Sequence, residues 1–253
     1  MKTKLSFFLC LLGLLAHSQN INIPDTNLKT ILSLSNTTTY LYAKNLSGQW
    51  MKVDTNGDGE IQPIEATLVK EVYLQNNNFS TPSYFVTHSL IGLESFPNMD
   101  SLYCNNNPFS SNMDFSSLIQ LKYLGVNSCN INSINVTGLN LLENFICGTN
   151  NLSSIDISGL PNLKSFYCQY NQISLLDLSN NPLLTTVNCD YNLLTSINLI
   201  NNPLFTSLYC SDNQIHSLDF SNNPMLKRLK CNNNNLNYLN IKNGINQDFS
   251  MLV

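Results

Sequence analysis

The stretch "LLTTVNCDYNLLTSINLINNP", residues 183–203, carries a pattern that recurs along most of the chain. Its skeleton consists of seven spaced positions: Leu184, Val187, Cys189, Asn192, Leu194, Ile197 and Leu199. Adding 21 to each number gives the equivalent residues of the next unit: Phe205, Leu208, Cys210, Asn213, Ile215, Leu218 and Phe220. Self-similarity at a short fixed period is typical of a solenoid, in which each unit buries its apolar face only by stacking on the next.

The apolar alternation in each unit predicts a short strand with two inward side chains. The strand centres form a series along the chain: Val72, Leu102, Leu124, Phe145, Phe166, Val187, Leu208 and Leu229. A unit this short leaves no room for a full helix on the back, so extended or 3₁₀ segments are expected there. The skeleton asparagine follows the strand, where its short amide can bond backbone groups that have no ladder partner.

The full pattern, L-x-x-L-x-C-x-x-N-x-L-x-x-L-x-L, is that of a leucine-rich repeat. Its cysteine, at the second inward strand position, resembles the cysteine-ladder repeats of bacterial internalin J-like surface proteins. The motifs "IPDTNLKTIL", "DTNGDGEIQPIEA" and "LYCNNN" look like those of exported leucine-rich repeat proteins of Flavobacteria and other Bacteroidetes. The resemblance implies a solenoid with a parallel β-strip on its concave face, protein or glycan binding at a cell surface, including adhesion, and no catalysis.

The repeating cysteines are expected to be free, buried thiols rather than disulfides. Neighbouring parallel strands lie about 4.8 Å apart with their side chains pointing the same way. A disulfide needs Cβ atoms that converge to about 3.5–4.5 Å. A straight ladder also cannot surround zinc tetrahedrally.

The sequence divides into three predicted segments. Residues 1–18 read as a signal peptide, with Lys2 and Lys4 before a short apolar run, so a secreted or cell-surface location is expected. That run is too short to span a bilayer stably, and no later stretch is long enough. Residues 19–66 are expected to form an amino-terminal cap, and residues 67–253 eight repeat units and an incomplete ninth.

The cap contains a motif for a metal ion. Asp25 is placed to cap a helix, and "DTNGDGEIQPIE", residues 54–65, follows it. This loop matches the EF-hand pattern of oxygen ligands at six positions: Asp54, Asn56, Asp58, Glu60 through its carbonyl, Gln62 and Glu65. The prediction is a structural Ca²⁺ staple. The alternative is an asparagine-rich turn without metal, in a chain with about forty asparagines.

Composition and motifs exclude several functions. With a net charge of -4 and 11% charged residues, the chain has no basic stripe for nucleic acid. His88 and His216 are the only histidines beyond the signal, and no hydrolase, zinc-protease or phosphate-loop motif occurs, so no enzyme is expected.

A binding face is predicted at the strand residues that flank the inward positions. The candidates are mostly tyrosines, on the strands and at the following turns: Tyr73, Tyr103, Tyr123, Tyr167, Tyr170, Asp190, Tyr191, Tyr209, Asp212 and Arg228. Such amphipathic rings suit protein or sugar ligands at low entropic cost. Two alternatives remain open. Tyrosine also has a high strand propensity, and the protein could be a structural or assembly scaffold of the cell envelope without a specific ligand.

Overall fold

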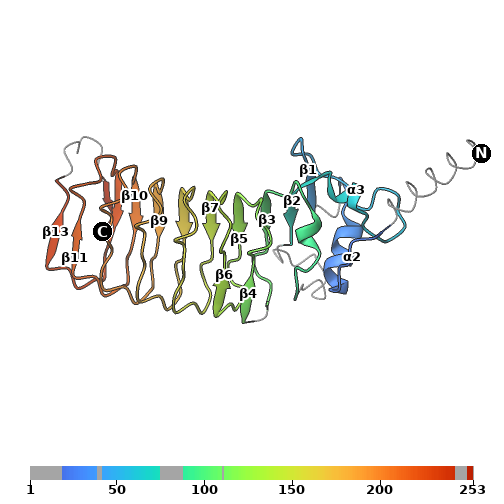
Figure 1. Ribbon diagram of the computed structural model, residues 1–253. Coiled ribbons are helices and arrows are strands. Elements are labelled where there is room, and N and C mark those ends of the chain that lie inside the picture. Colours follow the sequence, from blue (N-terminus) through green and yellow to red (C-terminus); the bar gives the residue numbers. More distant parts are fainter. Residues whose placement is uncertain (1–18, 39–41, 75–87, 110, 243–249, 253) are drawn as a thin grey trace, which may run out of the picture. The chain divides into compact units, whose positions relative to one another are not determined.

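The structure is a computed structural model that describes residues 19–38, 42–74, 88–109 and 111–242, together with the backbone of 250–252 (Figure 1). The chain forms two compact units. Of the described residues, the first comprises 19–38, 42–74 and 88–102, and the second comprises 103–109, 111–242 and 250–252. The predicted signal peptide lies outside the described residues, as do most of residues 81–89, which make the first repeat unit longer than the later ones.

The first unit combines short helices with an antiparallel strand pair. Helix α2 (Thr26–Leu34) begins at the predicted cap, because the Asp25 carboxylate accepts from the backbone N–H groups of Asn27 and Leu28 at 2.9 Å each. One face of α2 is buried. Strand β1 (Ala43–Asn45) pairs antiparallel with β2 (Val69–Tyr73). The unit also contains α3 (Pro63–Ala66) and the 3₁₀ turn η1 (Leu93–Ser95).

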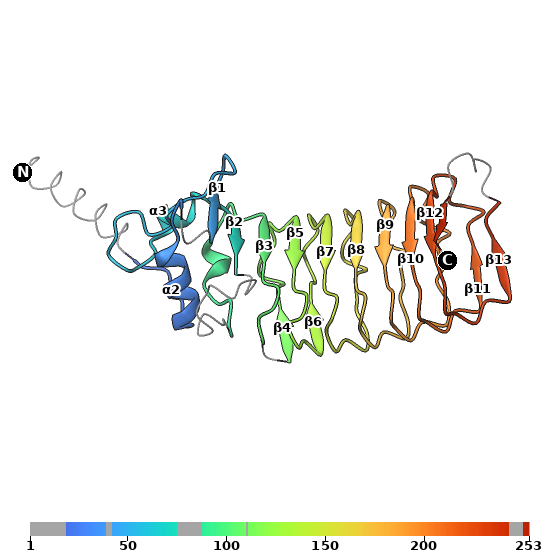
Figure 2. The same cartoon turned by 180° about the vertical axis from the view of Figure 1, so that it is seen from behind.

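The second unit is a parallel-strand solenoid (Figure 2). Its strands follow one another in the order β5 (Tyr123–Gly125), β7 (Asn144–Ile146), β8 (Ser165–Tyr167), β9 (Thr186–Asn188), β10 (Ser207–Tyr209), β12 (Arg228–Lys230) and β14 (Ser250–Leu252). Strand β3 (Ser101–Tyr103) lies at the division between the units. The predicted strand centres pair directly, Phe145 with Phe166 and Leu208 with Leu229, so the predicted register is confirmed.

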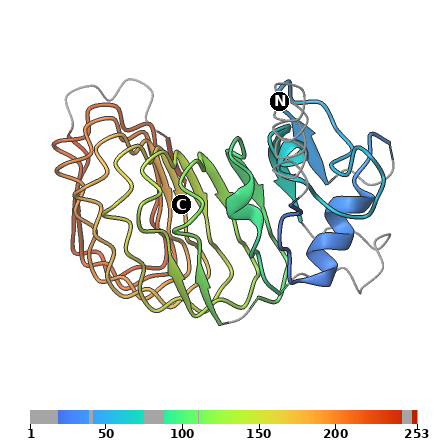
Figure 3. The ribbon, with the colours of Figure 1, turned by 45° about the vertical axis from the view of Figure 1, so that its right-hand side comes forward.

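The back of each coil is extended chain, as the short repeat predicts. Strand β4 (Asn112–Asp114) pairs with β6 (Ser133–Asn135), and β11 (Ser217–Asp219) pairs with β13 (Tyr238–Asn240), in both cases in parallel. Figure 3 shows the coils of this unit stacked one behind another. The buried side chains of the unit fill the inside of these coils. Because the strands from β5 to β12 pair at a constant spacing of 21 residues, equivalent residues of successive units form columns.

Phenylalanine and cysteine columns fill much of the core. Fully buried phenylalanines recur along the unit: Phe115, Phe145, Phe166, Phe205 and Phe220. All seven cysteines of the described chain are buried and carry free thiols: Cys104, Cys129, Cys147, Cys168, Cys189, Cys210 and Cys231. Burial raises the pKa of these thiols, to about 11 for Cys129, so each behaves as a small apolar side chain.

Two columns of buried asparagines bind neighbouring coils to each other. In the first, Asn192 Nδ2 donates to the carbonyl oxygens of Cys168, in the preceding coil, and of Cys189, both at 3.1 Å. In the second, Asn202 Nδ2 donates to the carbonyl oxygens of Leu178 and Asn181 at 3.0 Å each. These bonds satisfy backbone carbonyls that the sheet ladder does not reach, which a buried backbone requires.

Candidate functional site

The outward side chains of the parallel strands form one surface of the second unit, which we call the strand face. Its central residues alternate with the buried strand centres: Tyr103, Tyr123, Gly125, Asn144, Ile146, Ser165, Tyr167, Thr186, Asn188, Ser207, Tyr209, Arg228 and Lys230. Hydrogen bonds to the neighbouring strands on both sides hold the inner strands of this face, so its side chains stand on a rigid backbone.

Three tyrosines, from β3, β5 and β8, gather at one end of the strand face. The rings of Tyr103 and Tyr123 are stacked, with centroids 4.3 Å apart and planes at 28°. Gly125 permits this arrangement, because a Cβ there would lie 3.2 Å from the Tyr123 ring. Burial and the nearby hydroxyls of Tyr103 and Tyr167 raise the pKa of Tyr123 to about 12. With half-buried Ile146 between them, these side chains form an aromatic patch.

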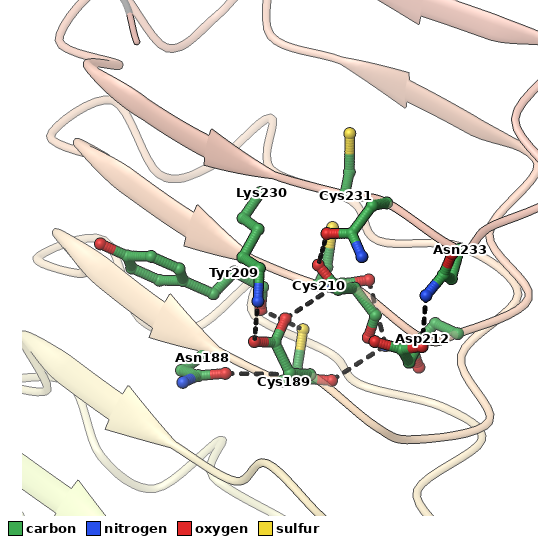
Figure 4. A network of polar contacts seen from close by, with 12 residues as sticks. Asn188, Cys189, Tyr209, Cys210, Asp212, Lys230, Cys231 and Asn233 are labelled. Carbon is green, nitrogen blue, oxygen red and sulfur yellow. Dashed lines mark hydrogen bonds and ion pairs between the residues drawn. The ribbon is translucent and has the colours of Figure 1, made fainter. Parts of the chain in front are cut away.

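Toward β10 and β12 the strand face is polar and charged (Figure 4). The Asp190 carboxylate accepts from the backbone N–H of Ser211 at 2.6 Å and lies 3.7 Å from Lys230 Nζ. Asn188 Oδ1 in turn accepts from the backbone N–H of Asp190 at 3.1 Å. Figure 4 also shows the sulfur atoms of Cys189, Cys210 and Cys231 following one another from coil to coil.

This network corrects one expectation for the strand face. Asp190 was expected to project toward a ligand, but it is only 8% exposed, because Ser211 and Lys230 close around it. Burial raises the pKa of its carboxyl, although the bond from Ser211 and the charge of Lys230 act in the opposite direction. Tyr209 is half-buried and Arg228 is exposed, so these two remain accessible on this part of the face.

The turn after each strand presents a second, separate row of side chains, which we call the turn column. Its members all have left-handed backbone with φ between 53° and 62°: Asn106, Ser128, Thr149, Tyr170, Tyr191, Asp212 and Asn233. This conformation costs a non-glycine residue roughly 1–2 kcal/mol, and asparagine and aspartate tolerate it best. Each member directly precedes the inward residue, usually an asparagine, whose side chain is hydrogen-bonded to the neighbouring coil. The left-handed turn directs that next side chain into the core.

Two tyrosines of the turn column are stacked and exposed. The ring centroids of Tyr170 and Tyr191 lie 4.4 Å apart with planes at 9°, and the two residues are 52% and 44% exposed. Asp212 lies on the next coil. Its charge, followed by that of Tyr170, raises the pKa of the Tyr191 hydroxyl. The structure thus separates the predicted binding residues into two sets, with Tyr103, Tyr123, Tyr167, Tyr209 and Arg228 on the strand face and Tyr170, Tyr191 and Asp212 in the turn column.

Comparison with known proteins finds no matching family model and no matching curated protein. Solved structures do match. Internalin C2 from Listeria monocytogenes superposes with a TM-score of 0.69 at 17% identity, over 94% of this chain and 97% of that one. A leucine-rich repeat protein of Leptospira interrogans gives a TM-score of 0.63 at 20% identity, over 75% and 50%. The chain has a leucine-rich repeat fold. The functional domain of InlJ from Listeria monocytogenes, which includes a cysteine ladder, gives 0.51 at 17% identity, over 93% and 63%.

In the first unit, Tyr73 at the end of β2 belongs to a cluster of its own. Its ring meets Trp50 edge-on with centroids 4.9 Å apart, and Lys44 Nζ lies 4.9 Å from both ring centroids. Lys44 also pairs with Glu71 at 3.1 Å, and the Tyr73 hydroxyl donates to the same carboxylate. Trp50 and Lys44 were not predicted from the sequence, although Trp50 is the only tryptophan of the chain.

The predicted calcium loop of the leucine-rich repeat protein is a series of side chain-to-backbone bonds. Asp54 is 3% exposed and accepts from the backbone N–H groups of Gly57 and Gly59 at 2.6 and 2.9 Å. Asn56 and Asp58 each accept from the N–H two residues further on. Glu65, 2% exposed, accepts from the N–H groups of Thr55 and Gln62. These bonds point the oxygens of Asp54, Asn56, Asp58 and Glu65 toward the loop.

Two further candidates stand at the same loop. Gln62 is buried, and its amide donates to Asp58, while the side chain of Glu60 pairs with Lys29 and leaves only its carbonyl for a ligand role. In the described chain, no three His, Cys, Asp or Glu side chains are placed together so as to hold a metal.

None of the helices among the described residues has the length and apolar character needed to cross a bilayer.

Proposed function

We propose that this leucine-rich repeat protein is a non-enzymatic binding protein that holds a protein partner on its strand face. The aromatic patch of Tyr103, Tyr123, Ile146 and Tyr167 carries the proposal. Tyrosine rings supply large contact areas and lose little rotamer entropy on binding, which makes them frequent centres of protein interfaces. The leucine-rich repeat fold supports the same reading, because a stacked strand surface suits extended partners.

The charged side of the strand face complements the patch. Arg228 and Lys230 stand two residues apart on β12, and Lys227 directly precedes that strand. In a chain with only 12 basic residues, this concentration favours a partner with an acidic margin beside its apolar contact. Charges at such a rim mainly increase the association rate, whereas the aromatic centre slows dissociation.

The place of action is proposed to be outside the cell or at its surface. This rests on residues 1–18, which have the form of a signal peptide. Adhesion is the proposed outcome of binding there. A structural or assembly role in the cell envelope is the alternative, and it predicts no partner whose capture depends on the strand face.

The test is capture of surface proteins by the immobilised protein, with labelled partners identified and their dissociation constants measured. The Tyr103→Ala/Tyr167→Ala variant is expected to bind its partner at least tenfold more weakly. Tyr238→Ala is the matched control, because Tyr238 is 52% exposed on the back of the unit. If the double variant captures the same partners with unchanged affinity, the strand-face proposal is wrong and the scaffold alternative is favoured.

We further propose that the loop of residues 54–65 binds Ca²⁺ as a structural staple. Asp54, Asn56, Asp58 and Glu65 would supply side-chain oxygens, Glu60 its carbonyl, and Gln62 its amide oxygen or a bound water. The fit rests on the local turns, in which alternate side chains already fold back toward the loop backbone. The ion would offset the mutual repulsion of three carboxylates and fix the loop against α3.

A further inference from the structure

We propose that Tyr170 and Tyr191, in the turn column, form a platform for a neutral sugar ring. This site lies outside the strand face and is independent of the protein-binding function proposed above. The two residues lie on neighbouring coils, and their rings are stacked, with planes 9° from parallel and centroids 4.4 Å apart.

The residue types chosen at these two turns indicate selection for the side chain. The backbone there is left-handed, with φ of 57° at Tyr170 and 54° at Tyr191. Of the other five positions in the column, three carry asparagine or aspartate, Asn106, Asp212 and Asn233, which suit this conformation, and two carry the small Ser128 and Thr149. Two tyrosines in succession therefore accept backbone strain that asparagine would avoid, and such strain is characteristic of functional positions.

The stacked pair leaves one ring face toward small neighbours. Because the stacking runs from coil to coil, the face of Tyr170 that turns away from Tyr191 points toward the coil of Thr149. Thr149 and, beyond it, Ser128 have short side chains, and Tyr170 remains 52% exposed. An aromatic face of this kind, bordered by small polar groups, accepts the apolar C–H face of a pyranose ring.

The surroundings supply the hydrogen-bonding groups that a sugar needs. Asp212 lies beside the Tyr191 hydroxyl, and Asn233 Nδ2 donates to the Asp212 carboxylate at 2.8 Å. These two groups lie on the Tyr191 side of the pair, so they would bind the hydroxyls of a neighbouring sugar in an oligosaccharide that runs along the turn column. The hydroxyls of Thr149 and Ser128 lie on the side of the ring that stacks on Tyr170. The Asp212 charge and the net charge of -4 disfavour anionic ligands, including nucleotides, so a neutral sugar fits best.

Binding of neutral hexasaccharides to the purified full chain tests this inference. Cellohexaose, laminarihexaose, chitohexaose and mannohexaose would be titrated by calorimetry and by saturation-transfer NMR of the tyrosine resonances. At least one is expected to bind, and Tyr170→Asn/Tyr191→Asn is expected to weaken it tenfold or more. The melting temperature of that variant should be equal to or above that of the wild type, since asparagine accepts the left-handed turn.

Three comparisons make the result decisive. Tyr170→Phe/Tyr191→Phe keeps both rings and should bind within threefold of the wild type. Tyr238→Asn and the strand-face variant Tyr103→Ala/Tyr167→Ala should leave sugar binding unchanged, which separates this site from the proposed protein interface. The inference is overturned if no hexasaccharide binds the wild type, if the asparagine variant loses less than tenfold, or if the strand-face variant loses as much.

Discussion

Asn171 joins the coil of Cys147 to its own coil, because its Nδ2 donates to the Cys147 carbonyl at 3.1 Å and to the Cys168 carbonyl at 3.0 Å. Its Oδ1 accepts from the backbone N–H of Leu152 in the preceding coil at 3.0 Å. One buried amide therefore bonds four backbone groups in two coils, the fourth being the Gln169 carbonyl at 3.4 Å. Cys129 occupies the equivalent place two units earlier, where its thiol donates to the Cys104 carbonyl at 3.3 Å.

Removing this amide is expected to destabilise the fold strongly. Asn171→Ala leaves the buried Leu152 N–H without its partner. It also removes one of two amide donors from the Cys147 and Cys168 carbonyls, to which Asn150 and Asn192 still donate. The change should lower the free energy of unfolding by about 2 kcal/mol. Asn171→Cys should cost less, since Cys129 already serves at that position. Urea denaturation followed by circular dichroism measures both. Asn151→Ala, at an exposed neighbour, is the control, and an equal loss for Asn151→Ala and Asn171→Ala would contradict the role of the amide.

The buried thiols make stability depend on alkaline pH. Burial raises the pKa of each thiol above its ordinary value of 9.0, to about 11 for Cys129. The protonated thiol is therefore the form that the fold favours. Stability is complete below about pH 9 and is lost as pH rises through the folded-state values, by up to about 1.4 kcal/mol per pH unit for each thiol.

Urea unfolding at pH 7 to 11 should show this decline, and Cys168→Ala should make it shallower. In the native protein at pH 8 the thiols should be unreactive to a disulfide reagent, and they should all react after denaturation. Rapid labelling of Cys147 or Cys168 without unfolding would contradict their burial.

Asp190 and Asp156 are expected to respond oppositely to pH. The pKa of Asp190 is raised, so its contribution is present at low pH and lost as pH rises through the folded-state value. The bonds from Ser158 lower the pKa of Asp156, so its contribution is lost as pH falls. Asp190→Asn should therefore match or exceed the wild type in stability at pH 7, and Asp156→Asn should fall below it. Thermal melts at pH 4 and pH 7 would show the two trends, and a large loss for Asp190→Asn at pH 7 would mean that the Lys230 pair dominates.

Calcium binding predicts a metal-dependent melting temperature. At a Ca²⁺ concentration 100 times its dissociation constant, binding would add about 2.7 kcal/mol to the free energy of unfolding. A chelator should remove this increment, and Asp54→Ala should make the protein insensitive to both calcium and chelator. Asp177→Ala, on an exposed turn of the second unit, should keep the full response. An identical melting temperature in calcium and in chelator would refute the staple.

The 21-residue period of the sequence was sufficient to predict the register of the strands, but it could not predict which outward side chains are buried. Val187 pairs with Phe166 and Leu208 as predicted, because a fixed repeat length fixes the neighbours of each strand. Alternation also gives the direction of each Cβ. It does not show what covers that side chain, and Asp190 is covered by Ser211 and Lys230 from the following coils.

The turn column was readable in part. Asn106, Asp212 and Asn233 share one register with Tyr170 and Tyr191, and asparagine or aspartate at three of the seven positions favours a left-handed turn there. The contact of Trp50 with Lys44 and Tyr73 could not be predicted from the sequence. It depends on the antiparallel pairing of β1 with β2, which is not part of the repeat pattern.

The left-handed turn gives each coil one exposed position whose side chain is not needed for the core. Gene duplication of a unit would lengthen the sheet by one strand and add one residue to this row, about 4.8 Å from its neighbours. A unit inserted between the coils of Tyr170 and Tyr191 would double their spacing and end the contact of their rings, although every core contact would be renewed. Ligand preference could thus evolve by the number and order of units alone, with no change inside any of them.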